Sequence, residues 1–189
     1  GQRLVAVGVD KLVTSSDGGV TWPDVTFIGG VNTLESILWD GARFVSVGSG
    51  GRVFRSLDGI SWSSVSIPGG PALKGVAWSG AVYVAVASGG SVFTSADAVS
   101  WSAPLAVSPT TLQAVEWDGS QFVAVVVAGA IFTSPDGSTW TDRSLGISQS
   151  FNDVHWTGTE LVAAASGGKI YTSLDGAAWD EESSGTTRR

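Results

Sequence analysis

The stretch SLDGISW, residues 56–62, decides the fold, because close variants of it occur four more times along the 189-residue chain. The other copies are SSDGGVTW from Ser15, SADAVSW from Ser95, SPDGSTW from Ser134 and SLDGAAW from Ser173. Their aspartates lie at positions 17, 58, 97, 136 and 175, so the first interval is 41 residues and the last three are 39. Self-similarity at a fixed period of this length indicates a repeat architecture.

The tryptophans follow the same period. Five of the nine end the repeated phrase, at positions 22, 62, 101, 140 and 179, and the other four lie 39 residues apart, at positions 39, 78, 117 and 156. Since a buried aromatic side chain removes roughly 150–250 Å² from water, we expect the nine tryptophans to dominate the core.

Residues 34–67 show how one unit is built. The segments LESILWDG, RFVSVGSGG, RVFRSLDG and ISWSSVSI each indicate a short strand, separated by turns rich in Gly, Asp and Ser. Repeated four-stranded units of about 40 residues are typical of a β-propeller. The sequence therefore predicts an all-β fold, a five-bladed β-propeller of four-stranded antiparallel blades in a single domain over residues 1–189. Its approximate repeat units are residues 1–33, 34–72, 73–111, 112–150 and 151–189.

One blade is predicted to lack its innermost strand. The strand that opens a unit occurs at residues 34–40, 73–79, 112–118 and 151–157 but has no counterpart in residues 1–33. We expect a closed ring in which the two ends of the chain meet and this position is vacant. An unpaired edge near residues 4–7 would recruit a strand, so strand exchange or oligomerisation is a hypothesis. Truncation of a longer array, an engineered deletion, and filling of the position by the tail EESSGTTRR are the alternatives.

Composition excludes several classes of partner and chemistry. The chain carries 17 acidic and 10 basic side chains, a net charge of −7, whereas nucleic-acid binding needs a concentrated basic face. Its longest apolar stretches are about six to eight residues, against the roughly 20 that span a bilayer, so no membrane contact is expected. The N-terminal GQRLVAVG lacks the layout of a signal peptide. The absence of cysteine excludes disulfides, thiolate chemistry and cysteine-based zinc sites.

The repeated phrase resembles the Asp box, Ser-x-Asp-x-Gly-x-Thr-Trp, of the sialidase-type (BNR) repeat. The copy at residues 15–22 fits every position, the other four are one residue shorter, and SADAVSW also lacks the glycine. The resemblance implies a hairpin turn between the third and fourth strands of each blade, distant from the ligand site. We therefore expect a structural role for all five aspartates, which accept hydrogen bonds from turn N–H groups, and a tryptophan that anchors the turn against the next blade.

The chain also resembles bacterial Asp-box propellers of the photosystem II assembly factor type. The resemblance lies in the SGTT segment, residues 184–187, and in strands of the pattern W-x-G-x-x-F-V-A-V-G. It implies protein binding and assembly work, usually outside the cytoplasm, so a secreted or periplasmic location is expected.

Function is expected at the end of the ring that differs between units. The other end repeats the Asp boxes and the turns WDG, WSG, WDG and WTG. At the variable end, equivalent positions carry different side chains. The candidate ligand-binding residues are Lys11, Glu35, Arg52, Lys74, Gln113, Asn152 and Lys169. The alternative interpretation is that these are solvated loop residues without a binding role.

A second candidate cluster lies on the innermost strands, which line the central channel of a propeller. Glu116, Asp153 and His155, the one histidine, are expected to converge there. One histidine with two carboxylates is a plausible set for a metal or for acid/base chemistry. A polar channel wall with bound water is the alternative that we adopt, so no metal and no cofactor are predicted.

Catalysis is not predicted. Sialidases use three arginines, a tyrosine nucleophile beside a glutamate, and an aspartate acid/base. Here Tyr83 and Tyr171 lie inside apolar strands, the arginines form no recognisable triad, and no Gly-x-Ser-x-Gly elbow, P-loop or dinucleotide fingerprint occurs. The sequence predicts a non-catalytic binding or scaffold propeller with a protein partner. A lectin-like propeller with a glycan partner is the alternative, and a sialidase-type glycoside hydrolase ranks below both.

Overall fold

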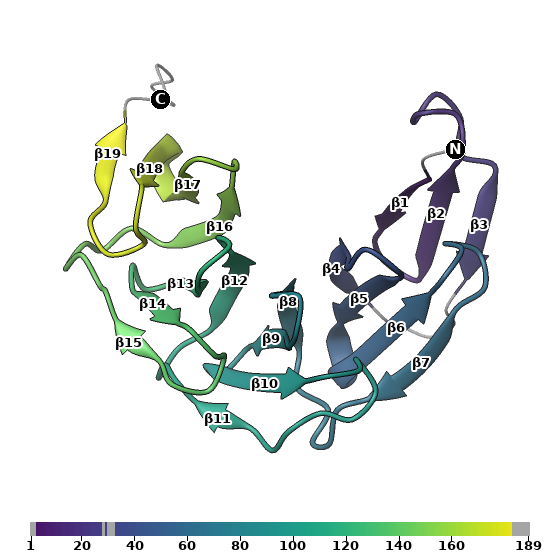
Figure 1. Cartoon of the computed structure of the whole chain (residues 1–189), viewed down its shortest axis with the longest axis horizontal. Coiled ribbons are helices and arrows are strands. Elements are labelled where there is room, and N and C mark those ends of the chain that lie inside the picture. The colour runs from purple at the N-terminus through teal and green to yellow at the C-terminus, as the bar shows by residue number, and fades with distance from the viewer. Residues whose placement is uncertain (1–2, 28, 30–32, 183–189) are drawn as a thin grey trace.

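The computed structural model describes residues 3–27, 29 and 33–182, which form five antiparallel sheets arranged along an arc (Figure 1). The first sheet contains β1 (Leu4–Val7), β2 (Lys11–Ser15) and β3 (Asp24–Phe27). The second contains β4 (Leu34–Trp39), β5 (Phe44–Gly48), β6 (Arg52–Ser56) and β7 (Ser63–Ser66). The third contains β8 (Leu73–Trp78), β9 (Tyr83–Ala87), β10 (Ser91–Ser95) and β11 (Leu105–Ala106).

The remaining two sheets repeat the same order. The fourth contains β12 (Leu112–Trp117), β13 (Phe122–Val126), β14 (Ile131–Ser134) and β15 (Thr141–Asp142). The fifth contains β16 (Phe151–Trp156), β17 (Leu161–Ala165), β18 (Lys169–Ser173) and β19 (Asp180–Glu182). The helical elements of the described residues are two short 3₁₀ turns, η1 (Ser49–Gly51) and η2 (Ser166–Gly168), and neither has the length or apolar character needed to cross a bilayer.

The sheets pack face to face through alternate residues of their second strands. In β9, Tyr83, Ala85 and Ala87 join the hydrophobic cluster shared with the second sheet, whereas Val84 and Val86 join the cluster shared with the fourth. Successive side chains of a strand point to opposite faces, so a strand covered on both sides must be apolar throughout. This explains why every residue of β9 and β13 is buried.

The expectation that tryptophans dominate the core is wrong. None of the nine is fully buried, and Trp39 is 51% exposed. The buried clusters consist mainly of Val, Leu, Ile, Ala and Phe, because adjacent sheets approach too closely for an indole ring at their centres. The tryptophans lie instead at the edges of these clusters.

Each repeated Ser-x-Asp turn is organised by its own side chains. In the second sheet, Ser56 donates to Asp58 at 2.9 Å and accepts from the N–H of Gly59 at 2.8 Å. Asp58 Oδ1 also accepts from the N–H groups of Ile60 and Ser61, at 2.9 and 2.7 Å. Asp17, Asp97, Asp136 and Asp175 accept N–H groups of their own turns in the same manner. The expected structural role of these aspartates agrees with this geometry.

In four of the five turns, the terminal tryptophan bonds to its own turn. Trp22, Trp62, Trp140 and Trp179 each donate Nε1–H to the glycine carbonyl three residues earlier, at 3.0–3.1 Å. Of the five rings, those of Trp62, Trp101, Trp140 and Trp179 pack against the cluster between their own sheet and the preceding one. The tryptophan therefore anchors the turn against the preceding blade, not the next one.

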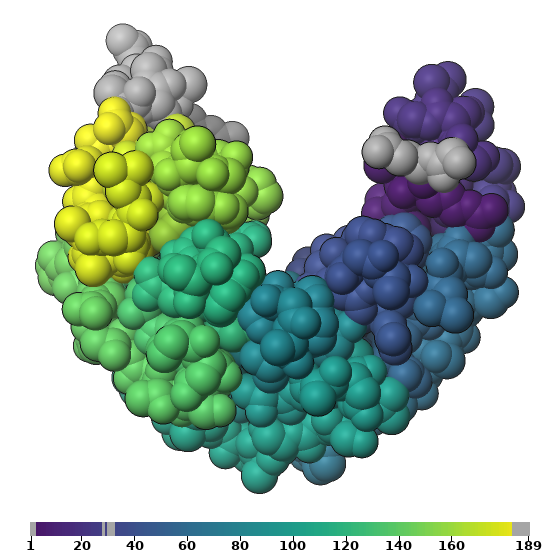
Figure 2. Space-filling model, in the orientation of Figure 1, coloured from purple at the N-terminus to yellow at the C-terminus, as the bar shows by residue number. Residues whose placement is uncertain are grey.

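The sheets form an open arc and not the closed ring that we expected. In the described part of the chain, each sheet packs on its neighbours in sequence, and the first and fifth sheets do not pack together. The space-filling view shows a wide opening between the two tips (Figure 2). The physical reason is the angle between successive blades, which is set by the side chains between them and leaves five blades short of a full turn.

The first sheet has three strands among the described residues, in the order β1-β2-β3. Its β1 corresponds to the second strand of the other sheets, so the position taken elsewhere by β4, β8, β12 and β16 has no strand in this part of the structure. One edge of β1 therefore pairs with β2 and the other pairs with no described strand.

Acid should destabilise the fold through the turn aspartates. Hydrogen bonds from the N–H groups of Ser100 and Val99 lower the pKa of Asp97 from 3.8 to about 2. A carboxyl group whose pKa is depressed by folding stabilises the folded state above its unfolded pKa, and this contribution is lost as pH falls from 3.8 towards 2. Asp97→Asn should lower the unfolding temperature at pH 7 and weaken its decline in acid, as measured by thermal unfolding across pH. The exposed strand residue variant Asp24→Asn is the control, and an unchanged acid profile in Asp97→Asn would contradict the role.

Candidate functional site

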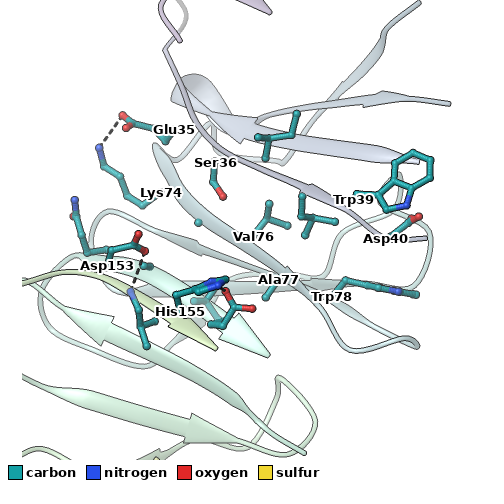
Figure 3. Close-up of a pocket in the computed structure, with 18 of the residues that line it drawn as sticks. Glu35, Ser36, Trp39, Asp40, Lys74, Val76, Ala77, Trp78, Asp153 and His155 are labelled. Carbon is teal, nitrogen blue, oxygen red and sulfur yellow. Dashed lines mark hydrogen bonds and ion pairs between the residues drawn. The ribbon is translucent and has the colours of Figure 1, made fainter. Parts of the chain in front are cut away.

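The concave side of the arc carries a groove of about 780 Å³. Its walls are the innermost strands of four sheets, β4, β8, β12 and β16, which lie next to one another (Figure 3). Four of the seven residues predicted at the variable end line it, and so do all three residues of the predicted channel cluster. These seven are Glu35, Lys74, Gln113, Asn152, Glu116, Asp153 and His155.

A β-bulge places one polar residue of each innermost strand in the groove. The pairing with the second strand skips one residue in each case, between Leu34 and Ser36 in β4 and at the equivalent place in β8, β12 and β16. The skipped residues are Glu35, Lys74, Gln113 and Asn152. A bulge leaves its extra residue out of the ladder and redirects its side chain. The four most variable positions of the repeat are thus presented on one wall.

Neighbouring strands pair opposite charges across the groove. Lys74 Nζ on β8 lies 3.0 Å from Glu35 Oε1 on β4 (Figure 3). Their side chains are 25% and 35% exposed, so water and ligands reach both. An ion pair at this exposure is weak and is readily exchanged for an interaction with a bound group.

A second pair lies at the other end of the groove. His155 Nδ1 on β16 lies 3.5 Å from Glu116 Oε2 on β12. Burial raises the pKa of Glu116, and Asp153 acts in the same direction, whereas the charge and hydrogen bond of His155 oppose the rise. Glu116, Asp153 and His155 thus share one electrostatic environment, and their role as a site stays a prediction.

The three residues do not have the arrangement of a metal centre. Within residues 3–27, 29 and 33–182, no group of three or more His, Cys, Asp or Glu side chains is placed to hold a metal ion. Asp153 instead accepts the N–H of Val154 at 2.9 Å. Glu116, Asp153 and His155 form part of the groove wall.

Three predicted residues lie outside the groove. They are the first residues of three equivalent strands: Lys11 of β2, Arg52 of β6 and Lys169 of β18. In the second and fifth sheets this is the third strand, counted from the concave side, and β2 is its counterpart in the first sheet. Lys169 is held by Glu181 at 2.7 Å, and the guanidinium carbon of Arg52 lies 5.6 Å above the ring centre of Phe54. The sequence analysis grouped them with Glu35 and Lys74 because all lie at the same end of a blade. In the structure they lie farther from the concave side than the innermost strands do.

The groove also contains residues that sequence analysis did not select. Trp39, Asp40 and Trp78 line it near the turns after β4 and β8. Trp39 packs on Phe44 with ring centres 4.6 Å apart, and Trp78 packs on Tyr83 at 4.0 Å. The repeated tryptophan–x–glycine turn was the feature of the sequence that could have identified these residues. Because the turn recurs so regularly, the sequence analysis assigned it a structural role only.

Both tyrosines donate their hydroxyl groups to carboxylates, Tyr83 to Asp40 and Tyr171 to Glu181. Burial and the hydrogen bond to Asp40 raise the pKa of Tyr83 well above its usual value. Burial and the hydrogen bond to Glu181 raise the pKa of Tyr171 as well. These raised pKa values favour the neutral phenols at neutral pH.

Comparison with known proteins defines the fold and leaves the family open. No protein-family model matches the sequence, and no curated protein matches it significantly. Among solved structures, the chain is similar to one described as "Crystal Structure of Mitotic Checkpoint Complex", with a TM-score of 0.79 and 10% sequence identity. The match covers 98% of this chain and 63% of the other, so the present chain spans less than two thirds of the length of that protein. At this identity the likeness shows a shared arrangement of blades and nothing about binding.

The coupling of Glu116 to its neighbours can be measured. His155→Gln should raise the pKa of Glu116 further, because it removes the group that favours the carboxylate. Asp153→Asn should lower it, because it removes a like charge. Carbon-13 NMR titration of the Glu116 carboxyl group would follow both variants. Shifts of the same sign in the two variants, or no shift in either, would contradict the arrangement.

Proposed function

We propose that this chain is a non-catalytic scaffold that binds a protein segment in the groove on the concave side of its arc. The observation that carries the proposal is the set of bulged residues, because each blade presents a different side chain at the same wall position. Along the groove wall, an acidic, a basic and two amide side chains follow one another. Such a series favours one orientation and one alignment of a bound partner. A linear peptide, whose side chains differ from residue to residue, matches such a surface.

The same observation favours protein over glycan. A lectin-like propeller with one sugar site per blade requires the same polar and aromatic residues in every blade. Glu35, Lys74, Gln113 and Asn152 differ in charge or shape at equivalent positions. The groove therefore fits one extended partner better than several identical sugars. Its mixed apolar and polar lining, which includes Val76 and Ala77 (Figure 3), also suits a peptide.

We further propose that the blades are of the Asp-box type. The support is the repeated turn, in which a serine and an aspartate together accept the turn N–H groups while the tryptophan bonds back to the turn. These turns lie at the end of the blade opposite to η1, so their aspartates have no access to the bulged residues. The resemblance accordingly supports a structural assignment and no sialidase chemistry.

Charge reversal of one groove residue should separate the groove from the rest of the surface. Lys74→Glu places a carboxylate against Glu35 and should weaken peptide binding by at least about tenfold, or about 1.4 kcal/mol. Lys11→Glu makes the same change outside the groove and should leave binding unchanged. Peptides selected from a random display library on the original chain would be titrated against both variants, with thermal unfolding as the folding control.

The outcome distinguishes the two candidate functions. Selected peptides that bind Lys74→Glu as tightly as the original chain would overturn the groove as a protein site. A glycan array screened in parallel provides the other arm. Glycan binding that Lys74→Glu abolishes would establish the lectin alternative, and glycan binding that it leaves unchanged would place a sugar site elsewhere.

A second mode of partner binding is favoured by the edge of β1 that pairs with no strand of the described residues. The other four sheets pair a strand with the equivalent edge, and those strands share an apolar first residue, a bulged polar second residue, an apolar fourth residue and a terminal tryptophan. We propose that β1 accepts a strand of this type, supplied by a second copy of the chain. Unpaired strand edges offer a ready template for such addition.

A synthetic peptide tests this mode directly. The peptide TLQAVEWDG, which copies residues 111–119, should protect the backbone amides of Leu4–Val7 from hydrogen exchange. The same peptide with proline in place of its valine should bind much more weakly, because proline removes a ladder N–H. Equal binding of the two peptides, or protection elsewhere than at β1, would contradict strand addition.

A further inference from the structure

A second cavity, of about 560 Å³, lies outside the concave groove on the second sheet. Two arginines line it, Arg43 just before β5 and Arg55 in β6. The rest of its wall comes from the Ser-x-Asp turn and the start of β7, with Leu57 and Trp62 as the apolar members. None of these residues takes part in the groove interactions described above.

Both guanidinium groups are under-satisfied. The Nε atoms of Arg43 and Arg55 are buried and have no hydrogen-bond partner in the described part of the chain. Arg43 Nε lies 3.4 Å from Asp40 Oδ2, which is an ion-pair contact and not a hydrogen bond. Arg55 forms no ion pair with the described residues. Each Nε–H is a buried donor without a partner, whereas the Arg43 side chain as a whole is 38% exposed and open to a ligand that supplies acceptors.

The nearby carboxylates do not neutralise the pair. Asp40 accepts the Tyr83 hydroxyl and the N–H groups of Ala42 and Arg43. Asp58 accepts the turn N–H groups of Ile60 and Ser61, and these hydrogen bonds lower its pKa without a contribution from either arginine. At least one guanidinium therefore lacks a counter-charge, while the two carboxylates limit how much negative charge the cavity accepts.

Comparison of the five repeats shows that the pair of arginines is particular to this blade. The position of Arg55 is threonine in all four other repeats: Thr14, Thr94, Thr133 and Thr172. The position of Arg43 is occupied by Arg3, Val82, Gln121 and Glu160. Arg3 and Gln121 donate to the aspartate carbonyl of the next turn, Asp58 and Asp175 respectively, whereas Arg43 remains beside its own cavity.

The equivalent cavity of the fifth sheet has the opposite charge. It measures about 200 Å³ and is lined by Glu160, Asp175 and Asp180, with no basic residue. The fold of the repeat thus creates a hollow at this place, and the side chains of each blade decide what it attracts. Of the second and fifth blades, only the second offers paired guanidinium groups at this place.

We propose that the Arg43/Arg55 cavity binds a monoanionic carboxylate attached to an apolar group. A planar carboxylate matches the fork of N–H donors on a guanidinium. Leu57 and Trp62 provide the surface for the apolar part. A dianionic phosphate is disfavoured, because Asp40 and Asp58 flank the site. The carboxylate belongs to a small organic acid or to the C-terminus of a peptide that ends in an apolar residue, and the chemistry is the same for both.

The test uses phenylpropionate and its neutral amide as probes on the intact chain. NMR titration should show that the acid binds next to Arg55 and Trp62 and that the amide does not. Arg55→Thr restores the residue of the other four repeats, so it should fold normally and weaken acid binding by about tenfold or more. Arg43→Gln, which carries the residue of the fourth repeat, should act in the same direction. Arg143→Gln, outside the cavity, is the matched control and should bind as the original chain does.

Peptides that end in phenylalanine, with a free or an amidated C-terminus, distinguish the two sources of the carboxylate. Binding of the free-acid peptide that exceeds that of phenylpropionate identifies a peptide terminus as the better ligand, and the reverse identifies a small acid. Equal binding of acid and amide would overturn the proposal, since the cavity would then recognise apolar surface alone. Unchanged binding in both Arg55→Thr and Arg43→Gln, or shifts confined to residues around Lys74, would overturn it as well.

Discussion

Burial of the sheet faces against the neighbouring sheets is the interaction on which the structure depends, and it covers both faces of the three inner sheets. A four-stranded sheet of this length exposes two apolar faces when it is alone, and the free energy gained by covering them comes only from the next blade. Alternate residues of β9 and β13 accordingly belong to different clusters. Small side chains at these contacts, such as Ala85 and Ala124, allow close approach. The contact geometry between one pair of blades, repeated, gives the arc its curvature.

The Ser-x-Asp turns contribute to the same packing. Each turn is closed by hydrogen bonds among its own serine, aspartate and backbone groups, so it can be placed against the preceding sheet as a rigid unit. The glycine of the turn lies where contact is closest: a Cβ at Gly137 would come within 2.5 Å of Val84 Cγ2. A positive φ of 76° adds a second reason for glycine there. The turn aspartates are thus committed to hydrogen bonds with the backbone of their own turns.

Departures from the repeat are where binding becomes possible. The bulge in each innermost strand is a constant of the fold, but the residue it presents changes from glutamate to lysine, glutamine and asparagine. The cavity beside the turn recurs in the second and fifth sheets, with two arginines in one and acidic residues in the other. A rigid scaffold that varies a few side chains at fixed places can acquire different sites without a change in its core.

The internal repeat made the strands predictable. The segments expected at residues 34–67 correspond to β4, β5, β6 and β7, and the aspartates of the turns accept the N–H groups that short-range reasoning assigned to them. Glu116, Asp153 and His155 were expected to converge because they share one face of neighbouring inner strands. Lys11, Arg52 and Lys169, predicted at the same variable end, lie outside the groove, because position along a blade gives no information about distance from the concave side.

The sequence by itself determined the period, the strands, the turn chemistry and the all-β class, because each of these depends on residues close together in the chain. Tertiary structure alone decided the opening of the arc, since the angle between blades results from many contacts between sheets. It also decided that tryptophans lie at the cluster edges and that Arg43 and Arg55 share a cavity. These features depend on distances between residues far apart in sequence, which a repeat pattern does not encode.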